Sequence, residues 1–533
     1  MSAKTLALLA GSSLLAAAAL AGAPDLGSEA QRKSGQALYA KNCSQCHGDT
    51  GDGNGPAAVH LKPKPRNFTA GKFKIRTTPS GALPTTADLE RVIKIGMPYS
   101  SMPAWPKLTD DEVRDLAYFV KTFSADFANP ELNVAPVELP KAPGYTKESA
   151  AAGRKVYEET GCIKCHGDLG RGDGPSARTL ADDFGNPLKP ADFTQRWTFR
   201  GGPSREDIFR TMTTGLNGTP MPAFGDALTP EQRWAITDYV YSLGDGDAPG
   251  YATLIHARHV DDPIDMTKGA AAFASVPAAR IPIVGQIMEP GREFHPPVVS
   301  VQVSAIYDAT DIAFFVRWND MSSETAGSNS PALAVPVEEE EAQETVAAAA
   351  GAATDEWGEA APATPAAGAA PAPQFSDAVA IQLPLALPTG ARKPYFLFGD
   401  ATNGVDLWFV DLARGEADQY VGKGSAAVVA ADASDVTSVA KYDRGEWSVV
   451  FKRSLTAAGG VPFNPGTFVP IAFSVWDGGS KERGNKRGLT VWSSLYVEPQ
   501  VVVSARGPAI EAGLLVLGAE LLIIFGVRRS RRT

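Results

Sequence analysis

The sequence predicts a multidomain chain with two all-α domains, then an all-β sandwich-like domain, then one C-terminal transmembrane helix. Three observations predict this architecture. Motifs in the first half recur at a fixed offset of 119 residues, which indicates two copies of one domain. In the second half, apolar residues alternate with polar ones, which is the period of a β-strand. Near the C-terminus an apolar stretch is followed directly by arginines.

The composition is that of a folded, mildly acidic protein. Of the 533 residues, 44% are apolar and 21% are charged, which suffices for several hydrophobic cores. Lys and Arg total 50 against 60 Asp and Glu, giving a net charge of −10 and no basic surplus for nucleic acid. All four cysteines lie in two Cys-x-x-Cys-His motifs, which excludes a disulfide-stapled scaffold.

Residues 1–23 are expected to form an export signal. Lys4 supplies the positive charge, residues 6–20 are apolar, and Ala21-Gly22-Ala23 is a small-x-small cleavage site. The alternative is that the segment stays attached as an uncleaved anchor.

The internal repeat defines two domains, residues 31–127 and 149–246, joined by a Pro-rich linker over 128–148. The segments that recur at the offset of 119 are Cys43-Ser44-Gln45-Cys46-His47 with Cys162-Ile163-Lys164-Cys165-His166, Gly55-Pro56 with Gly174-Pro175, and Met102-Pro103 with Met221-Pro222.

Each copy is expected to begin and end with a helix. The opening helices are predicted over 34–41 and 151–160. The closing helices are predicted over 109–123 and 229–243, each started by a Thr cap.

Residues 250–500 are expected to form the β domain. Its predicted strands span 299–305, 312–318, 378–383, 406–412, 446–453, 468–476 and 489–497. The segment 322–374 interrupts it with nine acidic residues and no Lys or Arg, so we expect a disordered spacer. An acidic docking arm for a basic partner is the alternative.

Residues 509–527 are expected to cross the membrane. Their 19 residues would form a helix about 28 Å long, close to the ~30 Å of a hydrocarbon core. The tail, 528–533, contains four arginines and is therefore expected on the cytoplasmic side of the inner membrane, with the main body periplasmic. Glu520 inside the span must be protonated or packed against a partner helix.

The two Cys-x-x-Cys-His motifs predict covalent attachment of two c-type haems. The thiols would bond the haem vinyl groups, and the adjacent imidazole would bind the iron from one face. The predicted attachment residues are Cys43, Cys46, Cys162 and Cys165, and the predicted iron ligands on this face are His47 and His166. A zinc site would need four ligands where each copy offers three, and a redox disulfide needs no following His.

Met102 and Met221 are predicted to bind the iron from the opposite face, because both lie 55 residues after the motif histidine and both precede a Pro. Met97 competes with Met102, but its counterpart in the second copy is Leu216. Met212 corresponds to Ile93, so we expect Met97 and Met212 to be core or loop residues.

With these motifs, the two copies resemble class I cytochrome c domains. The resemblance implies a small helical bundle around each haem, with one haem edge exposed. It implies no open coordination position, which favours electron transfer over oxygen binding or catalysis.

Residues 250–500 resemble the haem-b-binding γ subunit of ethylbenzene dehydrogenase and its relatives. The segments that carry the resemblance, in order, are 304–308, 313–318, 377–383, 395–400, 475–478 and 482–486. Those relatives serve periplasmic molybdenum enzymes of the type II dimethyl sulfoxide reductase family.

In that family a Met and a Lys bind a non-covalent b haem. Lys486 matches the family lysine, whereas the stretch where the Met belongs reads Leu397-Phe398. Other side chains that could replace the Met are His256, His259, His295, Met266 and Met288. The alternative is a β domain without b haem that serves as a docking scaffold.

Together these features predict a membrane-anchored, periplasmic multihaem cytochrome c. The resemblance implies electron transfer between a molybdenum oxidoreductase, whose catalytic and iron–sulfur subunits are other chains, and the respiratory chain or soluble or membrane cytochromes. The chain is then not an enzyme on its own. The alternatives are a dihaem relay for another oxidase or dehydrogenase, and a haem enzyme such as a peroxidase, which would need a vacant axial position.

Overall fold

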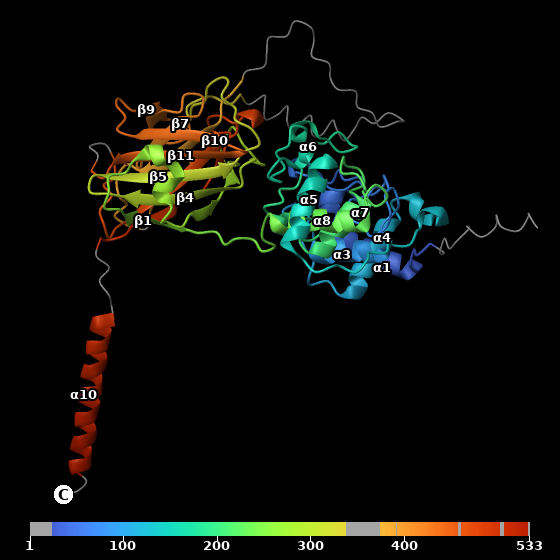
Figure 1. Ribbon diagram of the computed structural model, residues 1–533, viewed down its shortest axis with the longest axis horizontal. Coiled ribbons are helices and arrows are strands. Elements are labelled where there is room, and N and C mark those ends of the chain that lie inside the picture. The colour runs from blue at the N-terminus through green and yellow to red at the C-terminus, as the bar shows by residue number, and fades with distance from the viewer. Residues whose placement is uncertain (1–23, 337–373, 391, 457–459, 501–505, 531–533) are drawn as a thin grey trace, which may run out of the picture.

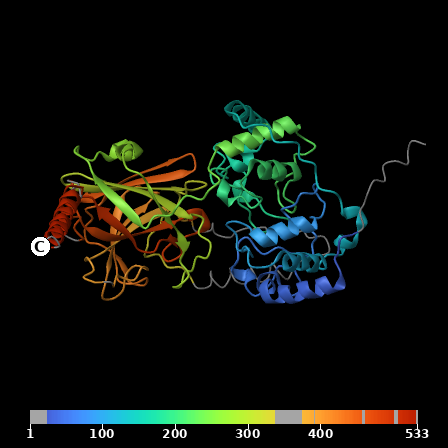
Figure 2. The same cartoon turned by 90° about the horizontal axis from the view of Figure 1, so that it is seen from below.

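The computed structural model describes residues 24–336, 374–390, 392–456, 460–500 and 506–530. The predicted export signal and most of the acidic segment lie outside the described residues. Two helical domains stack on one another at one end of the molecule, the β domain lies beside them, and a single helix extends from the β domain (Figures 1 and 2).

The first helical domain is a small bundle. Its described helices are α1 (Glu29–Asn42), α2 (Ser44–His47), α3 (Thr86–Ile95) and α4 (Asp110–Lys121), with 3-10 turns η1 (Ala58–His60), η2 (Ala125–Ala128) and η3 (Pro130–Leu132). Local sequence fixes where they start, since Ser28, Thr85 and Thr109 each form a reciprocal capping box. The cap at Ser28 starts α1 earlier than the predicted residue 34.

The second helical domain repeats this arrangement. Its described helices are α5 (Lys147–Glu159), α6 (Ile163–His166), α7 (Arg205–Thr214) and α8 (Pro230–Ser242), with η4 (Ala177–Thr179) and η5 (Arg196–Thr198). The crossing of α5 with α8 matches that of α1 with α4. A glycine lies at each crossing, close to the backbone of the partner helix. A Cβ on Gly35 would lie 2.1 Å from the carbonyl oxygen of Asp115, and a Cβ on Gly153 would lie 1.9 Å from the carbonyl oxygen of Ala235. Glycine therefore permits the close helix contact in both copies.

The β domain is one continuous mixed sheet folded over on itself. Its strands are β1 (Leu254–His259), β2 (Ala279–Pro282), β3 (Val284–Gly285), β4 (Ser300–Tyr307), β5 (Asp311–Asn319), β6 (Ala378–Pro384), β7 (Val405–Asp411), β8 (Ala417–Gly422), β9 (Val428–Ala430), β10 (Thr437–Asp443), β11 (Glu446–Ser454), β12 (Phe468–Trp476), β13 (Gly488–Leu489) and β14 (Ser493–Val497), with η6 (Met266–Phe273) and η7 (Gly478–Ser480). The main path runs β10-β11-β5-β4-β1-β14-β12-β6-β7-β8-β9. Strand β1 is parallel to both neighbours, and the other pairings are antiparallel.

Strand β12 joins the two layers of the sheet. Its first half pairs with β14 and its second half pairs with β6, so the sheet turns at this strand. The two layers then enclose a common core, in which Phe314 of β5 meets Trp408 of β7 with ring centroids 5.8 Å apart. This is the sandwich-like packing that the alternating pattern predicts.

The start of the acidic segment is ordered, which differs from the expected disorder over 322–374. Asn329 is buried, and its side-chain amide donates to the carbonyls of Ser376 and Glu482 at 2.7 and 2.9 Å. These partners lie far away in the sequence, so composition alone does not reveal them. Residues 337–373 of the segment are outside the described part of the chain.

Polar contacts join the three domains. Between the helical domains, Arg91 donates to the Gly201 carbonyl at 2.9 Å and to Asp207 at 3.2 Å. Arg178 of the second helical domain pairs with Glu324 of the β domain at 2.8 Å. The His295 ring nitrogen lies 3.0 Å from the carbonyl of His60, which links the first helical domain to the β domain.

Helix α10 (Arg506–Ser530) is the one described helix that is long and apolar enough to cross a membrane. The 20 residues from Ile510 to Arg529 meet this criterion, and none of that stretch is buried against the rest of the chain. Figure 1 shows α10 extending away from the β domain.

Candidate haem sites

The first Cys-x-x-Cys-His motif forms a single helical turn directly after α1. Cys43 ends α1 by donating its N–H to the Tyr39 carbonyl at 2.8 Å, and the His47 N–H donates to the Cys43 carbonyl at 2.9 Å. In such a turn residues three apart share a face, so the Cys43 and Cys46 thiols are presented on one side.

The imidazole of His47 is held by two contacts from one loop. Its Nδ1 lies 3.0 Å from the Arg66 carbonyl oxygen, and its ring stacks on Phe68 with centroids 4.5 Å apart. Because Nδ1–H donates to that carbonyl, Nε2 keeps a lone pair for a metal. Burial lowers the pKa of the His47 imidazole, which favours the neutral form that binds iron.

The second motif has the same design. The His166 Nδ1 lies 3.1 Å from the Ala191 carbonyl oxygen, and its ring stacks on Phe193 at 4.2 Å. Burial also lowers the pKa of His166. The second copy therefore presents Nε2 in the same way, although its loop to the carbonyl partner is longer.

These supporting phenylalanines were not predicted from the sequence. Phe68 and Phe193 each precede a Thr whose N–H donates to the Asn67 or Asp192 side chain at 2.9 Å. The signal in the sequence that could have revealed these phenylalanines is a short Asn/Asp-Phe-Thr pattern, which is present in both copies. It was missed because an insertion in the second copy shifts it away from the offset of 119 residues.

The predicted methionine ligands lie in equivalent loops. The N–H of Met97 donates to the Met102 carbonyl at 3.1 Å, and the N–H of Leu216 donates to the Met221 carbonyl at the same distance. Met97 and Leu216 thus occupy matching positions, as the repeat predicts. Both Met102 and Met221 are partly buried, and their assignment as iron ligands is taken up below as a proposal.

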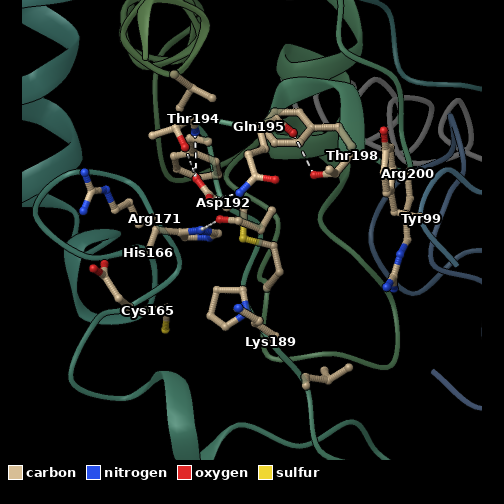
Figure 3. Close-up of a pocket in the computed structure, with 18 of the residues that line it drawn as sticks. Tyr99, Cys165, His166, Arg171, Lys189, Asp192, Thr194, Gln195, Thr198 and Arg200 are labelled. Carbon is tan, nitrogen blue, oxygen red and sulfur yellow. Dashed lines mark hydrogen bonds between the residues drawn. The ribbon is translucent and has the colours of Figure 1, made fainter. Parts of the chain in front are cut away.

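A cavity of about 740 Å³ lies at the second motif, and the side chains around it fit a haem. Its lining includes every predicted haem residue of this copy, namely Cys162, Cys165, His166 and Met221. Figure 3 shows His166 pointing into it, with Arg200 and Tyr99 across the cavity from Cys165.

All three domains contribute to the wall of this cavity. The first helical domain contributes Lys74, Ile75, Met97 and Tyr99, and the β domain contributes Val298, which precedes β4, and Trp318 of β5. The candidate haem site of the second copy therefore lies where the two helical domains and the β domain meet.

Three family models match consecutive parts of this chain. "Cytochrome c" matches residues 33–124, "Cytochrome C oxidase, cbb3-type, subunit III" matches residues 148–240, and "Ethylbenzene dehydrogenase" matches residues 426–488. The chain is a fusion of two cytochrome c domains with an ethylbenzene dehydrogenase domain. Its two cytochrome c domains imply haem c.

Similar proteins share parts of this chain. A protein described as a respiratory nitrate reductase heme subunit (ORF7) of Haloferax mediterranei is 30% identical over 165 residues, which is 30% of this chain and 57% of that protein. The cbb3-type cytochrome c oxidase subunit FixP of Bradyrhizobium sp. (strain ORS 278) is 26% identical over 220 residues, 40% of this chain and 62% of FixP. The chain thus spans 57% and 62% of the length of these two relatives.

One solved structure, of a Kuenenia stuttgartiensis reducing HAO-like protein complex, is 46% identical to this chain. The match covers 40% of this chain and 96% of that one, with a TM-score of 0.39.

The surroundings of Lys486 do not fit a haem b ligand. The Lys486 side chain is 6% exposed, and its Nζ lies 3.3 Å from the Ser480 carbonyl oxygen and 4.0 Å from Glu293. In the stretch where the family has Met, the Phe398 ring is covered by the Arg487 guanidinium at 3.7 Å. The other candidates have partners or point outward, since His256 lies 2.9 Å from Glu498 and Met288 is exposed.

Proposed function

We propose that this chain is a membrane-anchored subunit that carries two covalent c haems and relays electrons between a molybdenum oxidoreductase and the respiratory chain. A bound haem supplies a one-electron iron couple. The observation that carries the proposal is the duplicated motif turn, in which each histidine is oriented by a backbone carbonyl and a stacked phenylalanine.

The side chains have distinct roles in this proposal. The thiols of Cys43, Cys46, Cys162 and Cys165 fix each porphyrin. The Nε2 atoms of His47 and His166 and the sulfurs of Met102 and Met221 would hold the iron. If protein side chains held the iron in this way, substrate would have no access to it, which suits a relay and disfavours a peroxidase.

Two findings support a molybdenum oxidoreductase as partner. One is the ethylbenzene dehydrogenase domain, and the other is the relative described as a nitrate reductase heme subunit. The FixP relatives support the alternative, a relay for a terminal oxidase. We propose that α10 anchors the chain in the inner membrane with the haem domains in the periplasm.

The haem content of the full-length protein tests the cofactor part. A pyridine haemochrome assay is expected to give two c-type haems per chain. Because the surroundings of Lys486 do not fit an iron ligand, we expect no b-type haem. Mass spectrometry that finds no porphyrin on either motif would overturn the proposal, and one b-type haem per chain would restore Lys486 as a ligand.

Purification of the tagged full-length chain from solubilised native membranes tests the partner. We expect stoichiometric molybdenum and iron–sulfur clusters in the purified complex. Recovery with a haem–copper oxidase and without molybdenum would instead establish the alternative.

A further inference from the structure

Three cationic side chains meet where the two cytochrome c domains touch. Arg66 and Lys74 lie in the first domain between His47 and α3, and Arg200 lies in the second domain before α7. All three are partly buried. Among the described residues, no hydrogen bond or ion pair is found for the side chain of Lys74 or Arg200.

Lys74 and Arg200 line the cavity of the second haem site although they belong to different domains. Arg66 also reaches across the junction, since its guanidinium carbon lies 5.8 Å from the ring centroid of Phe184. Arg200 lies across the cavity from Cys165 (Figure 3). Arg200 therefore lies opposite the thiols that would hold the porphyrin, and Lys74 lines the same cavity.

The electrostatics of this cluster favour an anion. Burial, together with repulsion from Arg66 and Arg200, lowers the pKa of Lys74 to about 8. Burial lowers the pKa of Arg66 and of Arg200 as well. The charge of Asp182 opposes the shifts of Lys74 and Arg66, and that of Asp183 opposes the shift of Arg66, but neither carboxylate forms an ion pair with Lys74, Arg66 or Arg200. Partly buried cations without a paired counter-ion, such as Lys74 and Arg200, are costly, and an anion in the cavity would reduce that cost.

A c-type haem offers such an anion in the right place. Its vinyl edge is bonded to the two cysteines, and its two propionate carboxylates project from the opposite edge. A porphyrin fixed to Cys162 and Cys165 therefore directs its carboxylates across the cavity, toward the side on which Arg200 lies.

We propose that Lys74 of the first cytochrome c domain, together with Arg200, binds a propionate of the haem in the second domain. The first domain thereby helps to set the reduction potential of a haem it does not carry. A nearby positive charge stabilises the reduced iron and raises this potential. This inference rests on the proposed attachment of haem at the second motif.

The test is a redox titration of the full-length Lys74→Met protein, followed by electron paramagnetic resonance to resolve the two ferric signals. Met221→His identifies the signal of the second haem. We expect the second haem's midpoint potential to fall in Lys74→Met while the first stays unchanged. A tenfold change in its reduction equilibrium corresponds to about 59 mV. Lys74→Arg, which keeps the charge, should restore the potential.

Lys72→Met is the matched control. Lys72 lies in the same loop, but its Nζ pairs with Asp183 at 2.5 Å and it does not line the cavity. Equal shifts in Lys72→Met and Lys74→Met, or no shift in Lys74→Met, would overturn the inference. Lys74→Gln gives the same readout if Lys74→Met does not fold. A wild-type protein without porphyrin at the second motif would refute the proposed function instead, so the two failures are distinguishable.

Discussion

At the residue scale, both copies hold their histidine by the same means despite different loops. The Arg66 and Ala191 carbonyls accept from the ring nitrogens of His47 and His166, and each imidazole stacks on a phenylalanine. The two loops differ in length but place the same two contacts on the imidazole. This indicates that both loops serve to fix the orientation of the histidine ring. A fixed ring keeps Nε2 aimed at one position.

Met221→Ala tests the second axial position. Loss of the thioether is expected to leave the second ferric haem high-spin and to lower its potential, because a sulfur ligand raises the potential. The first haem should stay low-spin. Visible absorption and electron paramagnetic resonance measure both effects. Met97→Leu is the control, since Leu216 occupies the equivalent position; identical spectra for the two variants would contradict the assignment.

The matching placement of the two Cys-x-x-Cys-His motifs and of the two methionine loops could be predicted from the sequence, because these residues recur in register. Lys74 could not, since a contact between domains leaves no trace in residue spacing. The partners of Lys486 escaped prediction for a similar reason, because Glu293 lies far from it in sequence and meets it only in the folded β domain.

At the element scale, strong local signals were predictive and weak ones were not. Strands β4, β5 and β12 combine buried positions with clear apolar patterns, and all three were predicted within two residues. Strand β10 was missed because it has no buried residue, and β8 because most of its residues are only half-buried. Helices α3 and α7 were missed although Thr85 and Ser204 cap them.

A cluster of carboxylates lies at the start of β6 in the β domain. Asp377 accepts from the N–H groups of Glu324, Gly478 and the Trp447 indole at 2.7, 2.8 and 2.9 Å. Burial, reinforced by the charge of Glu324, raises the pKa of Asp377 to about 7. Burial also raises the pKa of its neighbours, Asp320 and Asp477. Arg178 pairs with Glu324 at 2.8 Å and offsets part of the charge.

Asp377→Asn is predicted to change how stability depends on pH. The folded protein keeps a proton on Asp377 up to about pH 7, whereas the unfolded chain releases it above pH 3.8. The contribution of this proton to the free energy of unfolding is therefore complete below about pH 4 and is lost as the pH rises to about 7. The wild type should therefore lose unfolding free energy relative to Asp377→Asn across that window. Thermal unfolding at several pH values measures the difference.

Asp308→Asn provides a control of opposite sign. Burial alone would raise the pKa of Asp308, but the N–H groups of Thr310, Asp311 and Ile264 hold it below 3.8. Its stabilising contribution is present at neutral pH and lost as pH falls below the unfolded value. A wild-type protein that gains stability relative to Asp377→Asn between pH 4 and 7 would contradict the prediction for the cluster.

At the scale of the whole molecule, the cavity of the second haem site is bounded by both cytochrome c domains and by the β domain. Domain order and type were predictable because each domain has its own sequence period. Their convergence on one cavity was not, since it depends on scattered contacts such as Arg91 with Asp207 and Arg178 with Glu324.

Removal of α10 tests the anchor. A chain that ends at residue 505 lacks the apolar stretch from Ile510 to Arg529 and is expected in the soluble fraction after alkaline washing of membranes. A chain that lacks only residues 531–533 should remain in the pellet. Immunoblots of both fractions measure the distribution. A truncated chain that still sediments with membranes would show that another segment or a partner holds it there.

The three-domain wall of the second cavity also constrains biogenesis. The β-domain portion, with Val298 and Trp318, is more than a hundred residues downstream of Cys162 and Cys165. If haem is attached to these thiols as proposed, attachment during synthesis from the N-terminus would take place before that side of the cavity exists. Porphyrin loading should therefore precede docking of the β domain, and a chain that folds completely without its cofactor would be a poor substrate for later repair.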